Sequence, residues 1–95
     1  MQGEGTGIRY ATVITRVRPR YSARAMQLNI QGSVRLDALV GTDGLVKRTC
    51  VVRSLDPDLD SEAAIATFQW RFKPAVQNNQ PVPSWVRVEM PFSLQ

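Results

Sequence analysis

Cys50 is the only thiol in this 95-residue chain, and the chain contains no histidine. A cysteine nucleophile needs a neighbouring base or a lowered pKa, and the apolar segment around Cys50 supplies neither. One cysteine without histidine also excludes an intramolecular disulfide, a zinc-finger ligand set and every His-dependent triad. We therefore expect no enzymatic activity.

Four carboxylates spaced two residues apart are the second chemical feature. They are Asp56, Asp58, Asp60 and Glu62. A calcium loop has similar spacing, but it requires glycine at its sixth position and glutamate at its twelfth, where this chain has Ser61 and Thr67. Negative side chains at the start of a helix interact favourably with its dipole. We therefore expect these carboxylates to cap a helix over about residues 60–69, and we expect no metal and no cofactor.

Arginines concentrate early in a chain whose net charge is +4 and whose pI is near 10.0. They are Arg9, Arg16, Arg18, Arg20 and Arg24. This charge suits an acidic partner, an anionic membrane surface or nucleic acid. A solvated basic face is the alternative explanation.

Length and composition indicate one globular domain, with 43% hydrophobic and 21% charged residues. The longest apolar runs have three or four residues, whereas a membrane-spanning helix needs roughly 20. We expect any export signal or anchor to lie outside this chain. Three glycines among residues 1–7 favour a flexible lead-in or a cloning remnant over residues 1–10, with the folded domain at residues 11–95.

The first half of the chain predicts an arm, a short helix and a hairpin. Residues 11–17 are rich in β-branched side chains, which favour an arm or edge strand, and Ser22 can cap a helix over about residues 23–28. Alternating apolar residues and a Gly-Thr-Asp-Gly turn predict a β-hairpin over residues 32–54. One extra residue near Lys47 and Arg48 would restore the alternation of its second strand, so we predict a bulge there.

The second half predicts a core helix and a final strand. Ala64, Ile65 and Phe68 share one helical stripe, and with Trp70 and Phe72 they are expected to be core. A polar turn over residues 78–83 precedes a final strand over about residues 84–94. Its inward row is Val86, Val88, Met90, Phe92 and Leu94, and its outward row is Trp85, Arg87, Glu89 and Pro91. The order β-α-β-β-α-β predicts an α+β fold, with a small antiparallel sheet of about three strands plus the N-terminal arm packed against two helices.

A series of short motifs covers about four-fifths of the chain, from Arg18 to Leu94. In order they are Pro-Arg-Tyr-Ser-Ala-Arg-Ala at residues 19–25, Gln-Gly-Ser-Val at 31–34, Asp-Gly-Leu-Val at 43–46, Leu-Asp at 59–60, Trp-Arg-Phe-Lys-Pro-Ala at 70–75 and Pro-Val-Pro at 81–83. In this order and spacing the sequence resembles the TonB C-terminal domain family. It departs from the family at Ser22, where proline is common, and at Arg18, where some transducers have glutamine.

This resemblance implies a periplasmic domain of a TonB-like energy transducer. The full-length parent would be anchored in the inner membrane and would work with an ExbB/ExbD-like proton-driven motor through the missing N-terminal region. Family domains bind the TonB box of TonB-dependent outer-membrane receptors as an added strand, and the pull then remodels the receptor plug. The family's peptide-contacting region resembles the segment Arg18, Pro19, Arg20 and Tyr21.

The residues of the final strand support the same partner-binding site independently of the family. A last strand with no successor leaves main-chain donors and acceptors open at an edge, where a peptide strand can bind. Pro91 has no N–H, so it fits only where its nitrogen points away from the ladder. The backbone groups of the outward row would then face the open edge. The candidate partner-binding residues of this strand are Trp85, Val86, Arg87, Val88 and Glu89.

Two other functions compete with peptide capture. A structural module can form a homodimer through the same edge, because self-pairing uses identical backbone groups. The element order and arginines also suit a nucleic-acid binder. However, no strand has the exposed aromatic pair that stacks bases and no GXXG clamp occurs, so we expect no nucleic-acid partner.

Overall fold

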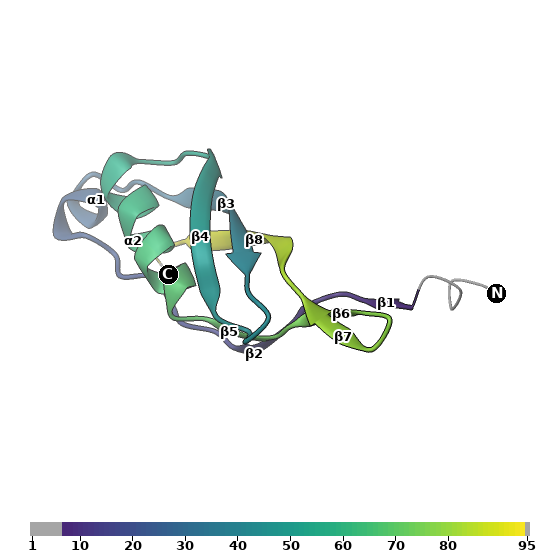
Figure 1. Ribbon diagram of the computed structural model, residues 1–95. Helices are drawn as coiled ribbons and strands as arrows, with labels where there is room; N and C mark the ends of the chain where they lie inside the picture. Colours follow the sequence, from purple (N-terminus) through teal and green to yellow (C-terminus); the bar gives the residue numbers. More distant parts are fainter. Residues whose placement is uncertain (1–6, 95) are drawn as a thin grey trace.

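A three-stranded antiparallel sheet and two helices form the body of the domain in the computed structural model, which describes residues 7–94 (Figure 1). The sheet has the order β4-β3-β8, with β3 at Gly32–Val40, β4 at Val46–Arg53 and β8 at Ser84–Phe92. The helices are α1 at Ala23–Gln27 and α2 at Pro57–Phe68. This arrangement confirms the predicted α+β fold of a small antiparallel sheet against two helices.

Five short strands extend the molecule to 52 × 24 × 21 Å. They are β1 at Ile8–Arg9, β2 at Thr12–Thr15, β5 at Arg71–Lys73, β6 at Ala75–Gln77 and β7 at Gln80–Val82. Strand β2 pairs with β5, and β1, β6 and β7 form a small sheet that projects from the body (Figure 1). The expected arm is thus strand β2, whereas the short sheet was not predicted.

The predicted lead-in of residues 1–10 contains β1, whose two residues pair with β6. Residues 1–6 lie outside the described residues, and the boundary of the domain stays a prediction. The expected polar turn lies between β6 and β7, where Asn78 and Asn79 have φ of 52° and 67°. Asparagine tolerates this left-handed conformation better than most residues, so the two amides can close a tight hairpin.

The core lies between the sheet and α2. Alternate residues of the strands face it, and α2 contributes one stripe at i, i+4 and i+7. The buried side chains include Val34, Leu36, Ala38 and Val40 of β3, Val88, Met90 and Phe92 of β8, and Leu59, Ala63 and Ala66 of α2. The inward row predicted for β3 is therefore confirmed, as is that of β8 at Val88, Met90 and Phe92.

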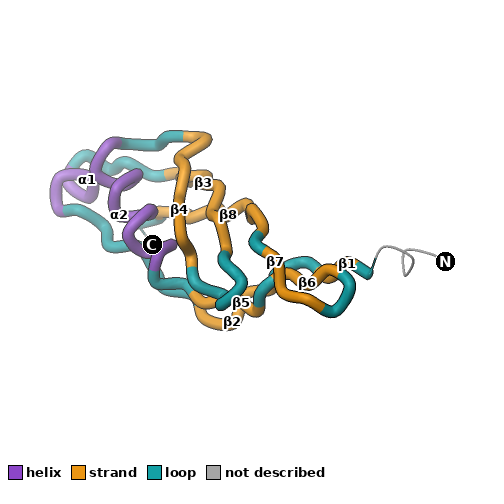
Figure 2. The backbone as a smooth tube through the Cα atoms, viewed as in Figure 1, coloured by secondary structure: helices purple, strands orange, loops and turns teal. Residues whose placement is uncertain are grey.

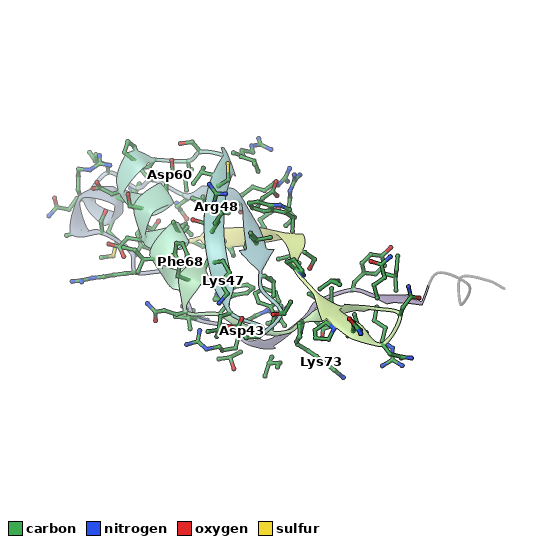
Figure 3. The ribbon with its side chains drawn as sticks, viewed as in Figure 1. Asp43, Lys47, Arg48, Asp60, Phe68 and Lys73 are labelled. Atoms are coloured by element: carbon green, nitrogen blue, oxygen red, sulfur yellow. The ribbon has the colours of Figure 1, made fainter. Side chains whose placement is uncertain are left out.

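The turn between β3 and β4 has the sharp reversal that its glycines predict. Gly44 has a φ of 82°, and Leu45 N donates to Asp43 Oδ1 at 3.0 Å. Lys47 pairs with Asp43 across the turn (2.8 Å), which lowers the pKa of that carboxyl (Figure 3). Register with β3 then skips Lys47, which confirms the predicted bulge. A second bulge at Val52 was not predicted.

Both helices begin at the side-chain caps expected of them. Ser22 Oγ accepts from Ala25 N at 3.1 Å, and Asp56 accepts from the amides of Asp58 and Leu59. Helix α2 starts three residues earlier than predicted, because Asp56 caps it and Pro57 occupies its first turn, a position where proline costs no hydrogen bond. The interpretation of the acidic cluster as a helix cap is confirmed at Asp56, and Asp58 and Asp60 lie in the first turn.

The predicted core stripe of α2 is wrong at Ile65 and Phe68, whereas Ala64 is partly buried against the core. Phe68, which is labelled in Figure 3, is 45% exposed. Ile65 is 53% exposed, whereas Trp70 and Phe72 are buried as expected. The predicted helix began at residue 60 and so left out Leu59. Leu59 belongs to α2 and sets its inward face together with Ala63 and Ala66, which leaves Ile65 and Phe68 on other sides of the helix.

Candidate functional site

Strand β8 is an edge strand, and its pairing with β3 is regular over its whole length. The register runs from Gly32 opposite Phe92 to Val40 opposite Ser84 without a bulge. Among residues 7–94, no strand pairs with the other side of β8. A straight edge of nine residues is therefore open to another strand.

Pro91 fixes the direction of the backbone groups along this edge. It lies opposite Ser33 in the register and has no N–H to donate, so this pair belongs to the non-hydrogen-bonded set of the antiparallel ladder. Hydrogen-bonded and non-hydrogen-bonded pairs alternate, so Trp85, Arg87 and Glu89 belong to the same set. Their N–H and C=O groups point away from β3, toward the open edge.

Strand β4, at the opposite edge of the sheet, is much less suited to strand addition. Its pairing with β3 is interrupted at Lys47 and again at Val52. Bulges twist and bend an edge, and proteins use them to prevent unwanted pairing. The two edges of one sheet are therefore different, and only β8 presents a continuous row.

A groove of about 1090 Å³ runs beside β8. Strand β8 forms one wall from Val86 to Phe92, and the N-terminal segment forms the other. Apolar side chains between the walls include Val13, Val17, Trp70 and Phe72. The groove thus combines an open backbone edge with an apolar lining, the combination with which domains bind extended peptides.

The N-terminal wall is the segment of residues 16–21, which joins β2 to α1 and is drawn as a loop in Figure 2. Trp70 Nε1 donates to Val17 O at 2.9 Å, and the hydroxyl of Tyr21 donates to Ile30 O. The Tyr21 ring also packs edge-on against Phe92 of β8, with 5.3 Å between centroids. These contacts hold both ends of the segment against the body.

Cross-strand ion pairs order the solvent-facing side of the same edge. Arg87 Nε donates to Asp37 Oδ1 at 2.8 Å, and Arg35 Nη2 donates to Glu89 Oε1 at 3.2 Å. The hydrogen bonds that Arg87 donates to Asp37 raise the pKa of Arg87. Exposed pairs of this kind contribute little to stability, but they neutralise both charged side chains of β8.

A separate charged cluster joins the starts of the two helices. Arg24 donates to Asp58 Oδ2 from Nε at 2.8 Å and to Asp56 Oδ1 from Nη2. The hydrogen bond from Arg24 lowers the pKa of Asp56 and raises that of Arg24. Asp60 accepts from Ser54 and from the amides of Leu55 and Asp56. Asp56 and Asp60 therefore accept main-chain N–H groups at the start of α2, Asp58 pairs with Arg24, and Cys50 lies exposed on β4.

Seven of the nine residues named from the sequence line the groove. They are Arg18, Pro19, Tyr21, Val86, Arg87, Val88 and Glu89. Arg20 is exposed on the N-terminal wall, and Trp85 lies opposite Leu39 on the solvent face of the sheet, 55% exposed. The structure brings the two predicted segments together across one groove. Whether they contact a partner stays a prediction.

Sequence reasoning missed several groove residues. Trp70 and Phe72 were assigned to the core, which is correct, but both also border the groove. Arg16 also lines the groove. Its spacing of two residues from Arg18 is a signal by which the sequence could have identified it as a site residue.

This fold and edge define a small two-layer α+β domain with an accessible β-strand beside a groove. Residues 17–94 match the family described as "Gram-negative bacterial TonB protein C-terminal". The match covers more than half of the chain, and the chain belongs to this family.

Two known proteins are similar to the chain. "Protein TonB" of Vibrio cholerae serotype O1 is 29% identical over 86 residues, which cover 90% of this chain and 35% of that protein. The chain thus spans about a third of the length of this relative. The solution NMR structure of the Pseudomonas aeruginosa TonB CTD has a TM-score of 0.73 at 23% identity, with 90% of this chain and 87% of that one covered. The predicted family resemblance and fold are confirmed.

Proposed function

We propose that this domain captures the TonB box of outer-membrane receptors by adding it as a strand to β8, and that it catalyses no reaction. The observation that carries the proposal is the uninterrupted edge of β8, whose outward backbone groups face a groove. Strand addition draws its affinity from main-chain hydrogen bonds and its selectivity from pockets for alternate side chains. The open edge of β8 offers the main-chain hydrogen bonds, and the apolar lining of the groove offers the contacts for side chains.

The proposed setting follows from family membership. The domain works in the periplasm as the C-terminal part of a TonB-like energy transducer, and the remainder of the parent protein supplies the inner-membrane anchor and the contact with an ExbB/ExbD-like motor. Within residues 7–94, neither α1 nor α2 has the length and the apolar character of a membrane-spanning helix. Residues 11–95 form the receptor-binding domain in this proposal.

The test compares two substitutions at Arg87. Arg87→Pro removes the central N–H of the outward row, and Arg87→Ala removes the same side chain and its ion pair with Asp37 while keeping the N–H. Pro91 lies four residues along the same strand and belongs to the same non-hydrogen-bonded set as Arg87. The fold therefore tolerates a proline at positions of this set. The measurement is calorimetric titration with a synthetic TonB-box peptide from a receptor of the source organism.

We expect Arg87→Ala to bind within about fivefold of the unmodified domain, because an exposed ion pair contributes at most about 1 kcal/mol. Arg87→Pro should bind at least tenfold more weakly while its circular dichroism spectrum is unchanged. Equal affinities of the two variants would contradict strand addition at this edge. Sedimentation of the peptide-free domain tests the competing homodimer, which Arg87→Pro should also dissociate if it uses the same edge.

A further inference from the structure

Three arginines lie in a row along the N-terminal wall of the groove. Exposed Arg16, Arg18 and Arg20 alternate with partly buried Val17, Pro19 and Tyr21. An extended chain repeats this pattern about every 6.6 Å, and Pro19 favours extended backbone for itself and for the residue before it. We call Arg16, Arg18 and Arg20 the arginine row.

The arginine row contains unneutralised charge. Arg24, Arg35 and Arg87 each pair with a carboxylate. Within residues 7–94, Arg18 and Arg20 have no ion pair, and the contact found for Arg16 is with the Trp70 ring, 5.8 Å from its centroid. Arg16 and Arg18 both line the groove.

The charges on the opposite wall do not offset the arginine row. Arg87 is paired with Asp37, and Glu89 with Arg35. The unbalanced charge beside the groove is therefore positive and has a period of two residues. A β-strand has the same period, so carboxylates at positions i, i+2 and i+4 of an added strand would have the spacing of the three guanidinium groups.

We propose that the arginine row selects partner segments that have acidic side chains at alternate positions. This inference rests on the proposed function, because it concerns the strand captured at β8. The open backbone row of β8 favours a peptide over other polyanions, since a phosphodiester chain has no N–H groups to pair with it. The row increases the rate of encounter and rejects basic segments, as charges at the rim of an interface do.

Three blocked nine-residue peptides test the proposal, with sequences TVDVDVDVT, TVNVNVNVT and TVKVKVKVT. Each reads the same in both directions, so the result does not depend on strand polarity. Two variants are compared with the unmodified domain. In the first, Arg16, Arg18 and Arg20 are changed to glutamine. The matched control changes Arg9, Arg48 and Arg53 to glutamine, which removes the same charge from exposed positions outside the groove.

The unmodified domain should bind the Asp peptide roughly tenfold more tightly than the Asn peptide at low salt, as three exposed ion pairs would give. The Lys peptide should bind most weakly. Substitution of the arginine row should abolish the preference and leave Asn-peptide binding within about twofold, while the control should keep the preference. If loss of the Arg16 contact with Trp70 unfolds the triple variant, the double variant Arg18→Gln, Arg20→Gln should still reduce the preference by more than half.

Equal binding of the Asp and Asn peptides would overturn the arginine-row proposal and leave strand capture standing. Equal loss of preference in the control would assign it to net charge and overturn the proposal as well. Failure of all three peptides, together with failure of the receptor peptide, would overturn strand capture itself. A nine-nucleotide DNA that binds more tightly than the Asp peptide, through the same arginines, would replace the peptide with a nucleic acid.

Discussion

Truncation of Leu59 in α2 should lower the free energy of unfolding more than truncation of Phe68, although phenylalanine has the larger side chain. Leu59 is fully buried against the sheet, and Phe68 is 45% exposed at the end of the helix. Removal of a buried leucine side chain leaves a cavity and costs about 3–5 kcal/mol. Phe68 loses only about half of the 1.5–3 kcal/mol that full burial provides, and its removal leaves no closed cavity. We therefore expect about 1 kcal/mol for Phe68→Ala.

Urea unfolding followed by far-ultraviolet circular dichroism measures both free energies, and thermal unfolding measures Tm. In a domain of this size 1 kcal/mol lowers Tm by about 4–8 °C, so Leu59→Ala should lose at least about 12 °C and Phe68→Ala about 4–8 °C. Leu59→Ala should consume much of the roughly 5–15 kcal/mol available to a small domain. A larger loss for Phe68→Ala than for Leu59→Ala would refute the assignment of the inward face of α2.

Three further predictions concern the acidic cluster and the turn between β3 and β4. The hydrogen bond from Arg24 lowers the pKa of Asp56 from its ordinary value of 3.8, so the ionised carboxyl stabilises the fold above pH 3.8. This stabilisation is lost as the pH falls from 3.8 through the lowered pKa. Unfolding midpoints between pH 5 and pH 3 should therefore fall less in Asp56→Asn, which keeps a capping side chain. Gly44→Ala should destabilise by at least about 1–2 kcal/mol, because the new Cβ would lie 2.0 Å from Phe72 O at a φ of +82°; Gly41→Ala, which meets the movable end of Lys47, should be tolerated, and equal midpoints would contradict the turn geometry. Dialysed protein should retain no stoichiometric zinc or calcium in metal analysis, and a retained ion would reopen the acidic cluster.

The sequence predicts the elements in which a single local rule decides the structure. One buried face imposes a two-residue period on β3 and β8, and the hydroxyl of Ser22 caps α1 through an amide three residues away. The bulge at Lys47 is also readable, because the alternation breaks there. The start of α2 was harder to locate, since Asp56, Asp58 and Asp60 are all suitable caps. The choice of Asp56 brings Leu59 into the helix, where it is buried on the same face as Ala63 and Ala66.

The groove depends on contacts between distant parts of the chain. Strands β5, β6 and β7 have three residues each, too few for a clear period, and β5 and β6 pair with β2 and β1 far away in the sequence. Trp70 holds Val17 across 53 residues. The sequence predicts the two segments that form the walls of the groove. It does not predict that they lie beside each other, because this depends on the packing between distant residues.

Hydrogen exchange of the β8 amides, measured by NMR with and without the TonB-box peptide, tests strand capture most directly. Trp85, Arg87 and Glu89 point their N–H groups away from β3, so they should exchange readily in the free domain. At a peptide concentration about ten times Kd, their exchange should slow by roughly tenfold, while Val86 and Val88, already paired with β3, change little. Protection along β4 instead, or binding without protection of Trp85, Arg87 and Glu89, would contradict the proposed function.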